Sequence, residues 1–160
     1  MDLKLVPVAI PEEANVIIGQ THFIKTVEDL YEIMVTSVPG AAFGLAFNEA
    51  SGACLVRAEG NDEGLRAAAI DTALALGAGH TFVIYLRKAY PINVLNRIKD
   101  CPEVCRIFCA TANPLQAVIV ESEQGRGIVG VIDGASPKGV EADGDREWRL
   151  SFLRTIGYKK

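Results

Sequence analysis

The sequence lacks an excess of positive charge. Its 160 residues contain 16 Lys and Arg against 20 Asp and Glu, which gives a formal net charge of −4. Proteins that bind nucleic acid in general do so by neutralising many phosphates with Lys and Arg. We therefore expect no nucleic-acid partner, although single basic spots remain compatible with this composition.

Long apolar runs and a secretion signal are also missing. No apolar run reaches the roughly 20 residues that a membrane-spanning helix needs. The first residues, in which Asp2 and Lys4 alternate with apolar side chains, lack the basic flank, apolar core and cleavage site of a signal peptide. We therefore expect a cytoplasmic protein with no membrane partner.

Paired CxxC motifs, which are typical of structural zinc sites, do not occur. Cys101, Cys105 and Cys109 recur at every fourth residue, a spacing that superficially suggests a ligand set. On a strand, however, Cys105 and Cys109 lie on one face, with Ile107 between them. The pattern therefore predicts buried thiols that act as small apolar side chains, and no zinc site.

Apolar residues are abundant, and their spacing predicts a single domain. They make up 49% of the chain and the mean hydropathy is +0.21, so we expect other copies to cover part of the surface in a homo-oligomer. Neither a repeat nor a low-complexity linker divides residues 1–160. The predicted fold class is α+β, with a mixed, largely antiparallel β-sheet flanked by helices. Strands are expected at 2–10, 15–18, 42–47, 54–58, 81–86, 104–110, 115–122 and 128–133.

Helical spacing predicts four helices, which begin near Thr26, Asn61, Pro91 and Asp145. The second is rich in alanine, which suggests close packing on a flat sheet. The last forms a C-terminal amphipathic helix and tail over 143–160. Its apolar residues lie four apart, and we expect them to dock on the protein's own core or on a neighbour. They are Trp148, Phe152 and Ile156.

The run from Glu121 to Gly139 concentrates glycine and charge: it holds five glycines, two cations and three carboxylates. Glycine lets a ligand approach the backbone amides, and Arg126 and Lys138 supply the charge that an anion needs. A glycine-rich hairpin followed by an exposed loop explains the same composition. Gly125, Gly127 and Gly130 match the dinucleotide-binding pattern, but a strand follows where that motif requires a helix. The P-loop pattern fails as well.

Two other places carry polar groups at the end of an apolar strand. Gln20 and His22 follow the strand at 15–18, where His22 is either a ligand contact or a hydrogen-bonded edge histidine. Arg87 and Lys88 precede the helix that begins at Pro91. Its free N–H groups and its dipole would favour an anion, whereas a solvated strand end explains the same residues.

The residue types needed for phosphoryl transfer are all present. That chemistry requires cations at the phosphoryl oxygens, a carboxylate for Mg²⁺ and a group that orients or deprotonates the attacking hydroxyl. By chemical type, the candidates are Arg126 and Lys138 for charge, Glu121, Glu123 or Asp133 for the metal or as base, and His22 or His80 as assistants.

Several long blocks in a fixed order resemble the adenosine-specific kinase family. They are VIIGQTHFIK at 16–25, GAGHTFVIYLRKAYPINVLNRIK at 77–99, CRIFCATANP at 105–114, EQGRGIVGVIDGASPKG at 123–139 and the closing IGYKK. The resemblance spans nearly the whole chain. It implies a symmetric homo-oligomer, expected as a trimer, that binds adenosine, AMP or ATP. It also implies phosphorylation of adenosine to AMP by ATP with Mg²⁺.

The resemblance also suggests site residues within the matching blocks. The candidate catalytic residues are His22, Glu123 and Asp133. The candidate nucleotide-binding residues are Gln20, His80, Arg87, Tyr90, Asn93, Gln124, Gly125, Arg126, Gly127 and Lys138. No metal ligand is assigned. We expect the corner at Tyr90 and Pro91 to offer a slot for adenine, across a subunit boundary. A non-catalytic oligomer that binds or senses adenine nucleotides is the alternative, and a structural oligomer without a small ligand is a third class.

Overall fold

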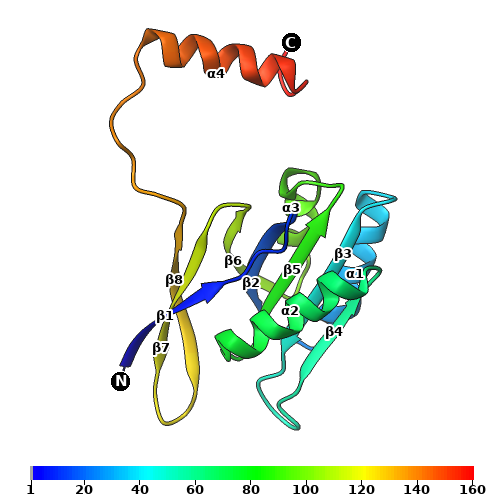
Figure 1. Cartoon of the computed structure of the whole chain (residues 1–160). Coiled ribbons are helices and arrows are strands. Elements are labelled where there is room, and N and C mark those ends of the chain that lie inside the picture. Colours follow the sequence, from blue (N-terminus) through cyan, green and yellow to red (C-terminus); the bar gives the residue numbers. More distant parts are fainter. Residues whose placement is uncertain (1) are drawn as a thin grey trace.

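Two antiparallel β-sheets form the body of the protein (Figure 1). The computed structural model describes residues 2–160. The strands are β1 (Asp2–Val8), β2 (Asn15–Thr21), β3 (Ala42–Asn48), β4 (Val56–Gly60), β5 (Thr81–Arg87), β6 (Val104–Thr111), β7 (Leu115–Glu121) and β8 (Arg126–Asp133). The helices are α1 (Thr26–Ser37), α2 (Glu63–Leu76), α3 (Pro91–Lys99) and α4 (Asp143–Thr155). The predicted α+β class is confirmed.

The strands divide between a five-stranded sheet of order β4-β3-β5-β2-β6 and a three-stranded sheet of order β1-β7-β8. Every strand pair is antiparallel. The sequence suggested one sheet, but the chain changes sheets twice, between β1 and β2 and between β6 and β7. Pro11 and Pro114, which cannot donate to a ladder, lie in these two connections.

Two hydrophobic cores lie on opposite faces of the five-stranded sheet. One core joins this sheet to α2 and to the inner face of the three-stranded sheet, while α1 and α3 cover the other face. The central strand β5 contributes to both, because Tyr85 faces the first core and Phe82 faces the second. The continuous apolar run in β5 reflects this double burial.

Helix α2 lies unusually close to strand β3, as its alanines predicted. Its residues Ala69 and Ala73 are fully buried. A Cβ added at Gly44 of β3 would meet the backbone of Leu65 and Arg66 far inside van der Waals contact. The helix begins at the N-cap Asp62, whose carboxylate accepts from the Leu65 N–H, and ends at the left-handed Gly77. This packing fixes where the C-terminal end of α2 lies.

The burial predicted for Cys105 is wrong. Cys109 is buried, but Cys105 is exposed. The pairing of β2 with β6 shifts between Ile18 and Gly19 and again between Gln20 and Thr21, which leaves Cys105 without a paired residue. Such bulges interrupt the alternation of side chains, so residues two apart no longer share a face.

The C-terminal helix α4 stands away from the body at the end of an extended segment (Figure 1). The helix was predicted within 143–160, and it spans Asp143–Thr155. None of its residues, all of which the structure describes, is buried. The expectation that it docks on the core of its own chain is therefore not met. Within residues 2–160, no helix combines the length and apolar character needed to cross a membrane.

Candidate functional site

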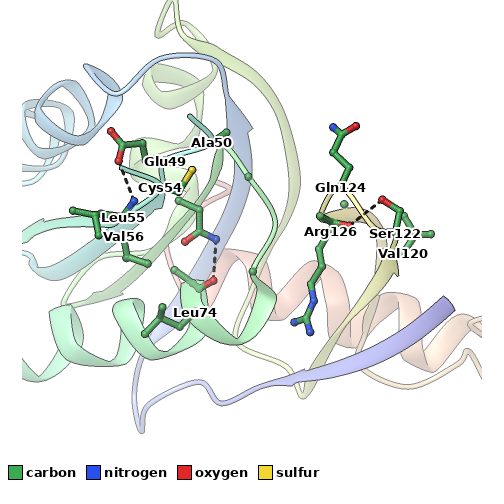
Figure 2. A pocket seen from close by; sticks show the side chains of 16 residues that line it. Glu49, Ala50, Cys54, Leu55, Val56, Leu74, Val120, Ser122, Gln124 and Arg126 are labelled. Atoms are coloured by element: carbon green, nitrogen blue, oxygen red, sulfur yellow. Dashed lines mark hydrogen bonds between the residues drawn. The ribbon is translucent and has the colours of Figure 1, made fainter. Parts of the chain in front are cut away.

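A cleft of about 570 Å³ opens where three segments meet (Figure 2). These segments are the β3–β4 loop, the C-terminal end of α2 and the β7–β8 hairpin. The volume lies within the range of small-molecule sites in proteins. The lining residues are Asn48, Glu49, Ala50, Cys54, Leu55, Val56, Ala73, Leu74, Gly77, Gly79, Val120, Ser122, Gln124, Gly125, Arg126 and Gly127.

Arg126 provides a fixed cation on the hairpin side of this cleft (Figure 2). Its Nε donates to the Glu121 carboxylate at 2.6 Å, and its Nη1 donates to the Ala75 carbonyl near the end of α2 at 3.3 Å. Hydrogen bonds from Lys4 and Arg126 lower the pKa of Glu121, so this carboxylate stays ionised beside the guanidinium. The side chain of Arg126 remains 33% exposed. The cation is therefore oriented and still accessible.

The hairpin tip beside Arg126 is the glycine-rich loop that the sequence predicted. Ser122 and Gly125 exchange backbone hydrogen bonds of 2.9 and 3.3 Å, which closes a tight turn between β7 and β8. The φ angle of +156° at Gly125 is one that L side chains rarely adopt, and a Cβ at this residue would have open space around it. The absence of side chains at Gly125 and Gly127 leaves their backbone open to a ligand in the cleft.

Asn48 and Glu49, at the end of β3, line the other side of the cleft. Asn48 Nδ2 donates to the carbonyls of Ala73 at 2.8 Å and Ala78 at 3.0 Å, which joins the end of α2 to the sheet. Glu49 accepts from the Leu55 N–H at 2.9 Å and from Arg57 at 3.2 Å. These bonds, that from Leu55 foremost, lower the pKa of Glu49. An ionised carboxylate therefore lines the cleft that Arg126 also lines.

The sequence predictions missed both Asn48 and Glu49. The available signal was two polar residues directly after a buried apolar strand, which is the same pattern that singled out Gln20 and His22. Of the predicted residues, Gln124, Gly125, Arg126 and Gly127 line the cleft together. Glu123 lies in the same hairpin tip and is exposed.

Three further predicted residues, Gln20, His22 and His80, lie at this same end of the five-stranded sheet. The His80 N–H donates to the Asn48 carbonyl at 2.7 Å, and the His80 carbonyl accepts from Thr21 at 3.0 Å. The His80 ring stacks at a centroid distance of 5.8 Å on Phe47, which belongs to the core covered by α1 and α3. Gln20, His22 and His80 thus lie near the cleft but do not line it.

Arg87, Tyr90 and Asn93 lie at the opposite end of the sheet. Arg87 and Tyr90 line a second hollow of about 690 Å³, where Arg87 Nε donates to the Glu12 carbonyl at 2.9 Å. The Asn93 side chain accepts from the Tyr90 N–H at 2.9 Å and thereby caps α3. The capping bond gives Asn93 a structural role that the sequence prediction did not include.

Asp133 is also far from the cleft within one chain. It accepts hydrogen bonds from Thr111 at 2.8 Å and from Asn113 at 3.1 Å. It closes β8, whose length of seven residue steps separates it from Arg126 by about 23 Å. Lys138 lies in the exposed segment between β8 and α4. The single chain thus brings neither Asp133 nor Lys138 to the cleft.

A buried carboxylate, Glu103, forms a second polar cluster that the sequence did not reveal. Only 3% of Glu103 is exposed, and it accepts from Lys25 at 3.1 Å and from the Cys101 thiol at 2.7 Å. Lys25 also pairs with Asp29. The donor atoms of Asp29, Cys101 and Glu103 lie within 4.8 Å of one another, a set that could hold a metal ion. Lys25 already supplies the positive charge, so the cluster serves to lock α1 to the start of β6.

The Glu103→Gln variant should change how stability depends on pH. Burial raises the pKa of Glu103, but hydrogen bonds, with those from Asp29 and Cys101 foremost, outweigh it and hold the pKa at about 2. The pKa of Glu103 in the native protein is below the ordinary glutamate value of 4.5, so Glu103 stabilises the fold above pH 4.5 and this contribution is lost as the pH falls towards 2. Glu103→Gln should be less stable than the wild type at neutral pH. Its stability should also fall less steeply than that of the wild type as the pH is lowered from 4.5 towards 2.

Urea unfolding at several pH values tests this prediction. Glu63→Gln is the matched control, because the side chain of Glu63 is 84% exposed and pairs only at the surface with Arg66. The prediction fails if Glu103→Gln and Glu63→Gln show the same stability and the same acid slope.

Comparison with known proteins places the chain in a family. Residues 6–159 match the family described as adenosine specific kinase. The crystal structure of the PH1918 protein from Pyrococcus horikoshii is 44% identical and superimposes with a TM-score of 0.96, over 99% of this chain and 98% of that chain. A search of curated proteins gave no match. Because the family match spans nearly all of the chain, this protein belongs to the adenosine-specific kinase family.

Proposed function

We propose that this protein phosphorylates adenosine to AMP with ATP as the donor, and that the cleft between α2, the β3–β4 loop and the β7–β8 hairpin binds the nucleotide. Family membership supports the substrate class. The observation that carries the location is Arg126, an oriented and accessible guanidinium beside an open glycine loop. Fixed cations and backbone amides are the groups that recognise phosphate in proteins.

The electrostatics of the cleft make Arg126 especially important. The C-terminal end of α2 points its last carbonyls, which carry partial negative charge, towards this region. That charge alone would disfavour a phosphate. Arg126 donates to one of these carbonyls, at Ala75, and brings a full positive charge to the same place. Phosphate binding in the cleft therefore depends on this residue.

Apolar side chains in the cleft suit the adenine ring. Leu55 and Leu74 are 52% and 61% exposed, although both are large apolar residues. With Val56 they line the cleft alongside its polar groups. A planar base laid against these side chains would remove apolar surface from water while its phosphate reached Arg126.

Glu49 is the residue that would hold Mg²⁺. The ion is commonly held by one or two carboxylates together with the phosphates of the substrate. Glu49 lines the cleft, and its lowered pKa keeps it ionised, as a carboxylate that binds a metal must be. When bound, the metal would neutralise charge on the phosphates. The base that deprotonates the adenosine hydroxyl stays a prediction among Glu121, Glu123 and Asp133, with His22 or His80 as the assisting group. Assembly into a trimer also stays a prediction.

A coupled assay for AMP formed from adenosine and ATP tests this proposal. We expect turnover that requires Mg²⁺ and falls at least tenfold in Glu49→Gln. This variant keeps an acceptor for the Leu55 N–H, and its affinity for AMP without metal should change little. No AMP above the enzyme-free control, at several metal concentrations, would contradict catalysis. Calorimetric binding of AMP and ATP without turnover would instead support the nucleotide-sensing alternative.

A further inference from the structure

Helix α4 exposes an apolar face that nothing in its own chain covers. Trp148, Phe152 and Ile156 are 66%, 44% and 43% exposed, and the two aromatic rings stack at a centroid distance of 5.2 Å. The helix has only 13 residues. Isolated helices of this length are marginally stable in water, so most of the stability of such a helix comes from packing its apolar face. This face therefore needs a partner surface.

The three-stranded sheet offers a matching apolar surface. Its inner face, with Leu115, Ala117 and Ile119, is buried in the core. Alternation and register place Leu3, Leu5 and Ile132 on the outer face, where they are 70%, 55% and 45% exposed.

The outer face also carries Gly130, where an added Cβ would meet nothing within 4 Å, so no side chain covers the sheet at this residue. Contiguous exposed apolar surface of this kind marks an interaction site.

The arm formed by residues 134–160 leads away from the body rather than across this face (Figure 1). It makes up about a sixth of the 160 residues. The TM-score of 0.96 over 99% of the chain can be reached only if the arm superimposes along with the body. A crystallised relative of 44% identity therefore holds its arm in the same extended position. A surface outside the chain must hold it there.

We propose that the Trp148–Phe152–Ile156 face of each α4 docks on the outer face of the three-stranded sheet of a second copy of this chain. We call the apolar face of α4 the donor face and the outer face of the three-stranded sheet the acceptor face. Because these are different surfaces, the contact between two copies is heterologous, and it closes into a ring or a reciprocal pair. Docking buries the stacked aromatic pair and the exposed leucines of β1 at once. The partner is a second copy of this chain because each chain carries both the exposed apolar face of α4 and the exposed apolar face of the sheet.

Trp148 makes this proposal directly measurable, because it is the only tryptophan in the chain. Its fluorescence reports on α4, and light scattering after gel filtration reports the mass. The acceptor variant is Leu5→Lys with Ile132→Lys, which leaves the arm untouched. The donor variant is Phe152→Glu. The control is Ile92→Lys on α3, where the replaced side chain is 67% exposed and far from both faces in the chain.

We expect the wild type and the control to be oligomeric with Trp148 emitting at short wavelength. Both the acceptor and the donor variant should be monomeric with Trp148 emission shifted to longer wavelength, while their far-ultraviolet circular dichroism keeps the sheet signal. A monomeric wild type would overturn the proposal. So would an acceptor variant whose mass and Trp148 emission match those of the wild type.

Discussion

Arg126→Ala is expected to weaken AMP binding by about 100-fold. A hydrogen bond to a charged group contributes about 1.5–3 kcal/mol, and a loss near 2.7 kcal/mol corresponds to this factor. The guanidinium is held at the cleft by Glu121 and Ala75, and among the described residues that line the cleft Arg126 is the only Lys or Arg. Adenosine lacks the phosphate and should lose much less affinity. Calorimetric titration of the wild type and the variant with AMP and with adenosine gives the loss of affinity for each ligand.

Arg66→Ala is the matched control for this experiment. Arg66 is likewise a paired arginine next to α2, but it lies in the first turn of that helix, bound to Glu63, and not in the cleft. Its removal should leave AMP affinity unchanged. Thermal unfolding of both variants would show that they remain folded. An AMP affinity for Arg126→Ala equal to that of Arg66→Ala would move the phosphate site elsewhere.

Gly44→Ala is expected to destabilise the fold by about 3 kcal/mol or more. Overpacking typically costs 1–3 kcal/mol, and this position is a severe case because the added methyl group would meet backbone atoms of α2, which cannot rotate away. Displacement of α2 also moves Ala73, Leu74 and Gly77, which line the cleft. Urea unfolding should show the loss of stability, and AMP affinity should fall in the variant that remains folded.

Gly64→Ala, in helix α2 itself, provides the comparison. A Cβ at Gly64 would approach only the Asp62 carboxylate, at 3.4 Å, which is ordinary contact. Because alanine favours a helix over glycine, this change should be neutral or slightly stabilising. If Gly44→Ala were as stable as Gly64→Ala, the close packing of α2 on β3 would be refuted.

Local patterns predicted most of the elements correctly. The alanines from 67 to 75 predicted a helix packed tightly on a sheet, and the structure confirms it at Gly44. The apolar run from Thr81 to Leu86 predicted a strand buried on both faces, which is β5. The glycine loop was recognised as part of a hairpin because a strand, not a helix, follows it. These predictions succeeded because each depends on neighbours in sequence.

The site could not be assembled in the same way, because it depends on contacts between distant segments. Asn48 belongs to the cleft through carbonyls at Ala73 and Ala78, about 25 to 30 residues away. Glu103 is a buried charge only because Lys25, 78 residues earlier, pairs with it. The division into two sheets likewise follows from pairings such as that of β1 with β7, which no local pattern reveals.

The most direct test of the proposed site is a crystal structure with AMP bound. We predict the phosphate beside Arg126 and the glycine loop, with the base against Leu55 and Leu74. AMP bound instead at the opposite end of the sheet, against Arg87 and Tyr90 in the second hollow, would contradict the assignment of the cleft.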